Sequence, residues 1–162
     1  MISLILAADP NGGIGYQNNL PWPKLKTDMK WFKEHTDGAV VVMGRNTWES
    51  LPVRLSNRTT VVLTRHDSSK ITIEGPDYVR TGDMADIVDE FAGRGHLCFI
   101  GGKQIYEQAR SFVDTAFITR LDEVFTCDTF IDVPSLTYGL KRETIIEVEE
   151  ESLRYTLETW KL

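Results

Sequence analysis

The sequence lacks the features that mark membrane-spanning, secreted and nucleic-acid-binding proteins. Its first apolar run, residues 2–8, has no basic flank and is far shorter than the roughly 20 residues of a membrane helix, so we expect neither a signal peptide nor a membrane partner. The two cysteines, Cys98 and Cys127, fit no metal-ligand spacing, so we predict no metal site and reduced thiols in a cytoplasmic protein. The net charge of -6 argues against nucleic acid as a partner.

The remaining composition is that of one globular protein. The chain has 162 residues, 41% of them hydrophobic, which suffices for a sizeable core but not for a second domain. There is no internal repeat or low-complexity segment, and no heptad pattern or long apolar patch points to a partner subunit. We therefore expect residues 1–162 to form a single domain and the protein to be a monomer.

Apolar runs bounded by turn residues alternate with amphipathic segments along most of the chain. The runs predict buried strands at residues 2–8, 39–43, 59–64, 78–80, 96–100 and 115–121. The amphipathic segments predict helices after Pro23 and at residues 44–51, 83–91 (with Asp83 as N-cap) and 103–110. Two closing segments, 143–150 and 153–161, could pair as a hairpin. This order predicts an α/β fold with a mainly parallel central sheet, an antiparallel C-terminal edge and helices on both faces.

One acidic residue is out of place on the helix after the prolines. At 3.6 residues per turn, Leu25, Met29, Phe32 and Thr36 fall on one face, and Asp28 lies inside that apolar stripe. A carboxylate there loses water and must find partners. Either the chain satisfies it locally, or a pocket uses it to grip a polar, nitrogen-rich ligand. Taken alone, the helix favours the local interpretation.

The glycine-rich segment at residues 11–20 follows the first strand. Its spacing is not that of the dinucleotide-binding fingerprint, and no helix is expected directly after it. Glycines make the segment flexible, and Ile14 and Leu20 are apolar residues that could cover something. A mobile lid over a ligand and a plain surface turn are both compatible with this pattern.

Basic residues follow two of the predicted strands. The short helix after Gly44 offers free backbone amides beside Arg45 and Thr47, an arrangement that suits a phosphate. Arg65 and His66 come directly after the third long strand, where an open α/β sheet exposes its binding crevice, and could hold a second anion. The alternative is that these are ordinary solvated side chains.

Short segments along nearly the whole chain point to one known family. They are Ile2–Ala8, Ile14-Gly15, Leu20-Pro21-Trp22, Asp28, Trp31-Phe32-Lys33, residues 43–50, Arg58, Ile100-Gly101-Gly102, Tyr106 and Asp128-Thr129. In this order and at these separations, they resemble the bacterial-type dihydrofolate reductases. The resemblance implies reduction of 7,8-dihydrofolate to 5,6,7,8-tetrahydrofolate by NADPH, a reaction that supplies one-carbon metabolism. Hydride would pass from nicotinamide C4 to pterin C6 with protonation of N5, and antifolate-type small molecules would also bind.

The resemblance also assigns substrate residues and reverses the preference for a local role of Asp28. Asp28 matches the family's acid that bonds the pterin 2-amino group and N3. Thr119 matches the threonine that supports this acid, and Trp22 matches the residue that holds a water near it. Together with Leu20, these form the implied catalytic set. The implied substrate-binding residues are Ile5, Ala7, Asp28, Phe32, Leu51, Arg58, Ile100 and Tyr106. Among them, Phe32 and Leu51 would sandwich the aromatic parts of folate, and Arg58 would bind the α-carboxylate of its glutamate tail.

For NADPH, the resemblance implies residues at several strand ends. Those bordering the nicotinamide would be Ala8, Ile14 and Leu20. Those around the pyrophosphate and the rest of the cofactor would be Gly44, Arg45, Asn46, Thr47, Leu63, Gly101, Gly102, Lys103, Gln104, Ile105 and Thr129. Thr64 and Arg65 would contact the adenosine 2'-phosphate. A cis peptide is expected between Gly101 and Gly102, as in the family.

The sequence departs from the commonest family pattern at several positions. Leu20 replaces a frequent methionine on the lid, and Asn46 replaces a histidine that often contacts the pyrophosphate. Arg65 stands where some members have serine, which should favour NADPH over NADH. Pro23-Lys24 adds one residue before the first helix.

Two rival functions use the same fold. A reductase of a ribosylated pyrimidine, as in riboflavin synthesis, would need a grip on a ribose phosphate and gives no reason for Asp28 and Arg58. A non-catalytic nucleotide-binding module would bind NADPH without turning over dihydrofolate. The acid, the lid segment and the arginine all argue for the reductase of dihydrofolate.

Overall fold

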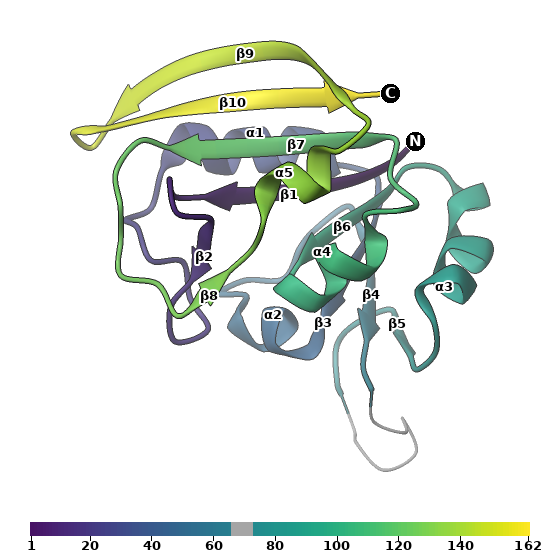
Figure 1. Cartoon of the computed structure of the whole chain (residues 1–162). Helices are drawn as coiled ribbons and strands as arrows, with labels where there is room; N and C mark the ends of the chain where they lie inside the picture. Colours follow the sequence, from purple (N-terminus) through teal and green to yellow (C-terminus); the bar gives the residue numbers. More distant parts are fainter. Residues whose placement is uncertain (66–72) are drawn as a thin grey trace.

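An eight-stranded sheet forms the centre of the molecule in a computed structural model that describes residues 1–65 and 73–162 (Figure 1). The strand order across the sheet is β5-β4-β3-β6-β1-β7-β10-β9. Its strands are β1 (Ile2–Ala8), β3 (Val40–Gly44), β4 (Thr59–Leu63), β5 (Tyr78–Arg80), β6 (Leu97–Gly101), β7 (Thr115–Leu121), β9 (Lys141–Glu150) and β10 (Leu153–Lys161). Neighbours from β5 to β7 run parallel, whereas β10 is antiparallel to both β7 and β9. The predicted mainly parallel sheet with an antiparallel C-terminal edge is therefore confirmed.

Helices cover both faces of this sheet. They are α1 (Lys26–Thr36), α2 (Arg45–Ser50), α3 (Met84–Phe91), α4 (Lys103–Ala109) and α5 (Val133–Thr137), with a 3-10 turn at Ala92–Arg94. Figure 1 shows α1 behind β1 and β7, and α4 and α5 in front of the sheet. The core is accordingly split into two apolar clusters, one under α1 and one under α3, α4 and α5. None of the helices in the described ranges is long and apolar enough to cross a membrane.

Buried runs of branched residues explain the central strands. Val41, Val42 and Met43 on β3 are fully buried, since one helical layer covers each face of the sheet. Because β1, β3, β4, β6 and β7 are parallel, their C-terminal ends meet at one edge of the sheet. That edge is where ligands bind in open α/β sheets, and it carries most of the predicted site residues.

Three short elements were not predicted from the sequence. Strand β2 (Gly13–Gly15) pairs with β8 (Thr129–Phe130) in a separate small sheet, and α5 follows it. The glycine-rich segment is therefore partly a strand rather than wholly an irregular loop. These elements have two to five residues, too few to show a periodic pattern in the sequence.

The inward face of α1 differs from the predicted stripe. Met29 is 47% exposed, whereas Trp31, which was left out of the stripe, is only 7% exposed and packs edge-on against Phe117. The stripe is rotated because its centre runs through Leu25 and Asp28 to Trp31, which places Met29 on its flank. Asp28 consequently lies even closer to the middle of the buried face than the sequence pattern indicated.

The N-terminus of α3 begins as predicted at Asp83, but its side chain makes no capping hydrogen bond. The backbone carbonyl of Asp83 accepts from the amides of Asp86 and Ile87 instead. The helix is anchored mainly by three buried residues on its inner face, Met84, Ile87 and Phe91.

Candidate active site

Asp28 and Thr119 meet between α1 and β7. The Thr119 hydroxyl, only 1% exposed as a residue, donates a hydrogen bond of 2.6 Å to the Asp28 carboxylate. Thr119 pairs in register with Ala7 on β1 and Leu157 on β10, so the strand lattice fixes its position. Burial raises the pKa of Asp28, the Thr119 hydrogen bond partly offsets this rise, and the negative charge of Glu150 adds to it. Asp28 is thus a carboxylate with fewer partners than its burial demands.

Two predicted site residues, Trp22 and Tyr106, carry buried polar groups on aromatic rings. The indole N–H of Trp22 is buried and finds no hydrogen-bond partner among the described residues. This fits the water-holding role that the resemblance implies for Trp22. The buried hydroxyl of Tyr106 lies 2.8 Å from the carbonyl oxygen of Ile5 and 2.9 Å from that of Ile100, which ties α4 to the ends of β1 and β6.

The residues expected to meet the rest of folate come from α1 and the segment after α2. Phe32 and Leu51 are partly buried against the α1-side core. Arg58 is half-buried and donates from Nη1 to the Thr36 hydroxyl at 3.0 Å and from Nε to the Ser56 carbonyl at 2.8 Å. Burial lowers the pKa of Arg58. These bonds hold the guanidinium at the C-terminal end of α1, two turns from Asp28.

The predicted cofactor residues at the ends of β3 and β6 come together. Gly101 has a φ of 128° and is joined to Gly102 by a cis peptide bond, as expected. A Cβ at Gly101 would lie 3.2 Å from the Tyr106 hydroxyl and 3.5 Å from Thr47 Oγ1, and one at Gly44 would lie 3.6 Å from Ile105. The positive φ and the nearby Tyr106 hydroxyl therefore favour glycine at position 101, whereas a Cβ at Gly44 would make only an ordinary contact.

The basic cofactor residues are more exposed than the acid site. Arg45 pairs across one helical turn with Glu49 at 2.8 Å, and both side chains are largely in solvent. Arg65 is exposed after β4, whereas Thr64 before it is buried. His66, which was predicted beside Arg65, lies outside the described residues. The other predicted residues of this region are Asn46, Lys103 and Gln104, which are exposed, and Leu63, which is buried.

The glycine-rich segment is held at its start and again at Gln17. Asp9, 5% exposed, accepts hydrogen bonds from the amides of Asn11 (2.9 Å), Gly13 (2.8 Å) and Phe125 (3.0 Å). Further along, the amide of Gln17 donates to the Asp128 carboxylate at 2.8 Å. The segment that follows is less confined.

The predicted lid residues differ in their surroundings. Ile14 packs against the main apolar cluster and Ala8 is buried, whereas Leu20 is 64% exposed. Thr129, predicted to touch the cofactor, pairs with Gly15 across the small sheet. Leu20 therefore stands free at the far end of the segment, on the side where α1 begins.

Sequence analysis missed two acids that matter to this site, Asp9 and Glu150. Asp9-Pro10 before a glycine-rich turn is a recognisable signal for a carboxylate that binds amides just ahead of it, and it was treated only as a strand end. Glu150 has no local signal, because its carboxylate reaches the amide of Thr27, which is 123 positions away in the chain.

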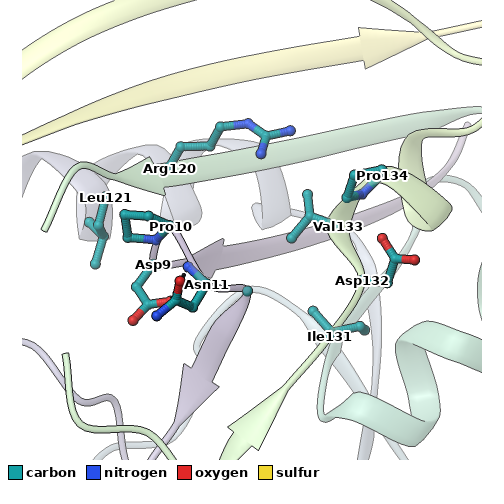
Figure 2. Close-up of a pocket in the computed structure, with 10 residues that line it drawn as sticks. Asp9, Pro10, Asn11, Arg120, Leu121, Ile131, Asp132, Val133 and Pro134 are labelled. Atoms are coloured by element: carbon teal, nitrogen blue, oxygen red, sulfur yellow. Dashed lines mark hydrogen bonds between the residues drawn. The ribbon is translucent and has the colours of Figure 1, made fainter. Parts of the chain in front are cut away.

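A second cleft of about 500 Å³ lies beside the small sheet (Figure 2). Its walls are the turn after β1, the end of β7 with Arg120 and Leu121, and the segment from Ile131 to Pro134 that leads into α5. None of the predicted site residues lines it. The cleft is therefore separate from the Asp28 site and lies behind the Asp9 turn.

The comparisons with known proteins agree with one another. A family model described as dihydrofolate reductase matches residues 1–162. The chain is 37% identical over 142 residues to dihydrofolate reductase type 8 from Escherichia coli, which covers 82% of this chain and 80% of that protein. It is 36% identical over 129 residues to the dihydrofolate reductase of Staphylococcus aureus, and the match covers 80% of this chain and 76% of that protein. Among solved structures, the chain is similar to dihydrofolate reductase from Enterococcus faecalis complexed with NADP(H) and RAB-propyl. The TM-score is 0.85 at 30% sequence identity, and the match covers 99% of this chain and 95% of that chain.

Proposed function

The chain belongs to the dihydrofolate reductase family, and from this premise we propose that the hydrogen-bonded pair of the partly buried Asp28 and the buried Thr119 is its substrate-binding and catalytic centre. The protein is an NADPH-dependent oxidoreductase that reduces dihydrofolate to tetrahydrofolate. The rival function of a pyrimidine reductase is thereby set aside. The roles of the individual residues are our proposal.

The partner count at Asp28 is the observation that carries this proposal. An ionised carboxylate has about four acceptor positions. Within the described ranges, its single hydrogen bond comes from Thr119, although Asp28 is only partly exposed to water and burial raises its pKa. The free acceptor positions suit two neighbouring N–H donors on one edge of a ligand, such as the 2-amino group and N3 of a pterin. Binding would then satisfy a group that the folded chain alone leaves short of partners.

The chain's own part in the reaction is to orient the pterin and control its proton. Bound NADPH would supply the hydride. Asp28, kept ionised, would draw the pterin edge into place and favour positive charge on the ring, so that N5 takes its proton from water. The buried Trp22 N–H would hold such a water near the acid. Leu20 and Ile14 on the lid would exclude bulk solvent.

For the cofactor, we propose two kinds of contact. The glycines at 44, 101 and 102 would let the pyrophosphate approach backbone amides beside Thr47 and Ile105. Arg45 and Arg65 would neutralise phosphate charge from the solvent side. Arg65, after the strand that ends at Leu63, is the residue we propose to contact the 2'-phosphate and so to favour NADPH over NADH.

Arg58 provides the sharpest test of how folate lies in the cleft. Its bonds to Thr36 and Ser56 aim it at the outer end of the cleft, where it would bind the α-carboxylate of the glutamate tail. Arg58→Gln should raise KM for dihydrofolate about tenfold, because a charge-assisted hydrogen bond is lost. It should leave KM unchanged for a 7,8-dihydropterin that lacks the tail. NADPH oxidation, followed by absorbance, measures both.

The matched control is Arg54→Gln, an exposed arginine on the same loop that donates to the carbonyl of Gly75. It should leave both values of KM unchanged. If Arg58→Gln raised KM equally for dihydrofolate and for the dihydropterin without a tail, the glutamate tail would not be bound by Arg58. Absence of turnover by the unmodified protein would overturn the proposed function itself.

We also propose that the enzyme is a cytoplasmic monomer whose ligands are dihydrofolate and antifolate-type small molecules, without nucleic acid or membrane partners. The charged residues of the edge strand β9 support this, because they discourage pairing with a second sheet. The complex of the Enterococcus faecalis relative with the small molecule RAB-propyl supports the proposal that small molecules other than folate bind. Sedimentation of the purified protein with and without NADPH would test the monomer.

A further inference from the structure

Glu150 connects the tip of the C-terminal hairpin to the first turn of α1. It is the last residue of β9, and its carboxylate accepts a hydrogen bond of 3.0 Å from the amide of Thr27. The hydroxyl of Tyr155, on the returning strand, donates to the same oxygen. Thr27 immediately precedes Asp28, so this contact holds the very turn that carries the acid.

This contact replaces a cap that α1 does not make for itself. Leu25 stands at the N-cap position and offers no side-chain hydrogen bond to the orphan amides of the first turn. A carboxylate at a helix N-terminus also interacts favourably with the helix dipole. Glu150 thus supplies from the hairpin what the local sequence lacks.

The same hairpin supports the other partner of the acid. Tyr155 is buried on β10, two residues before Leu157, which pairs in register with Thr119. Hence one rigid element, the β9–β10 hairpin, holds α1 through Glu150 and backs the strand that carries Thr119. The relative position of Asp28 and Thr119 depends on this element.

The negative charge of Glu150 acts on Asp28. The pKa of Glu150 is lowered, chiefly by the hydrogen bond from Tyr155 and also by the amides of Thr27 and Lys26, so it is ionised at neutral pH. Its negative charge raises the pKa of Asp28. Tyr155 on β10, which donates a hydrogen bond to Glu150, stays neutral because burial and the charge of Glu150 raise its pKa. Thr119 from β7, which donates to Asp28, carries no charge, and Lys26 on α1, whose amide also faces Glu150, has an exposed side chain.

We propose that Glu150 is a positioning residue for the reduction: it caps α1 beside the acid and adds a negative charge behind Asp28 that favours proton uptake by the bound pterin. This inference rests on the proposed function. The charge acts in the same direction whether the titrating group is Asp28 or pterin N5, because either one becomes more positive on protonation.

The test is Glu150→Gln, which keeps an oxygen acceptor for Thr27 and Tyr155 but removes the charge. Single-turnover hydride transfer with saturating NADPH and dihydrofolate should show its apparent pKa lowered by about half a pH unit. At a pH above that pKa, the rate should fall about threefold. The shift should shrink as salt is raised toward 1 M, since screening weakens the interaction.

Glu149→Gln is the matched control, because Glu149 is adjacent in sequence but exposed and paired only with Arg154 at 3.8 Å in the described structure. Its pH profile should follow the unmodified enzyme. A Glu150→Gln profile identical to the unmodified enzyme, or an equal shift in Glu149→Gln, would overturn the inference while leaving the proposed function intact. Circular dichroism and thermal unfolding would verify that both variants fold, and an unmodified enzyme without turnover would instead overturn the proposed function.

Discussion

Asp9 is a buried acid and Asp28 a partly buried one, and the chain treats them in opposite ways. Asp9, at the end of β1, receives three backbone amides. Burial alone would raise its pKa, but the hydrogen bonds from Phe125, Gly13 and Asn11 outweigh that effect and leave the pKa below its ordinary value. Asp28 receives one threonine hydroxyl, and burial leaves its pKa above the ordinary value.

The difference is the one we expect between an acid that stabilises the fold and an acid that we propose to bind a ligand. The partners of Asp9 all belong to the chain, and they join the glycine-rich turn to the segment before β8. Asp28 has one hydrogen-bond donor, Thr119, among the described residues, and we propose that a ligand fills its other acceptor positions. A buried acid with a raised pKa and too few partners is therefore the better marker of a site than burial alone.

The largest effect that we expect comes from removing the structural acid. Asp9→Asn should lower the free energy of unfolding by about 2 kcal/mol, because charge-assisted bonds are lost and an amide NH₂ would face a backbone N–H. The pKa of Asp9 is depressed, so its stabilisation is present above the unfolded pKa and lost as pH falls through the folded value. Urea unfolding at neutral and acidic pH would measure both the loss and its disappearance in acid.

The control for this variant is Asp132→Asn, an exposed acid on the same side of the molecule. It should change stability by less than about 0.5 kcal/mol. If Asp9→Asn were as stable as the unmodified protein at neutral pH, the three amide contacts would not be a structural hub and the contrast between the two acids would fail.

The next effect is smaller in free energy but falls on catalysis. Asp28→Asn should slow hydride transfer at least tenfold at neutral pH, about 1.4 kcal/mol in barrier, because the neutral amide no longer favours positive charge on the pterin. Stopped-flow single turnover measures this step directly. A rate equal to that of the unmodified enzyme would show that the acid has no part in the reaction.

The same variant should behave oppositely to Asp9→Asn in stability. The raised pKa of Asp28 means that ionisation destabilises the folded protein above that pKa, and that protonation relieves the cost as pH falls. At neutral pH, the free energy of unfolding of Asp28→Asn should therefore be at least that of the unmodified, ligand-free protein. Any difference in its favour should vanish in acid, where Asp28 is protonated. A clear loss of stability at neutral pH would indicate that Asp28 is a structural acid like Asp9.

The sequence pattern was sufficient for the frame, and it singled out one unusual acid. Continuous apolar runs predicted the parallel strands, whereas the charge at Asp28 within an apolar stripe left both a local role and a ligand-binding role open. Both signals are local, because they depend on spacing within one segment. The resemblance to a family then supplied Thr119, whose hydrogen bond to Asp28 is present in the structure.

What could not be predicted depends on contacts between distant segments. The pairing of β2 with β8 and the reach of Glu150 to Thr27 join residues more than a hundred positions apart. The exposure of Met29 and burial of Trp31 depend on how α1 rotates against Phe117, which helical spacing does not specify. Sequence periodicity identifies a face of a helix but not the atoms that will meet it.

The most direct test of the account is the pKa of the Asp28 carboxyl itself, measured by carbon NMR titration of selectively labelled protein with and without folate. The ordinary pKa of an aspartate is about 3.9. We predict that the pKa of Asp28 lies above this value in the free protein. It should fall when folate binds, because the pterin N–H groups complete the hydrogen bonds of the carboxylate. A free-protein value at or below the ordinary range, or one that folate does not move, would contradict the claim that this acid is held ready for the ligand.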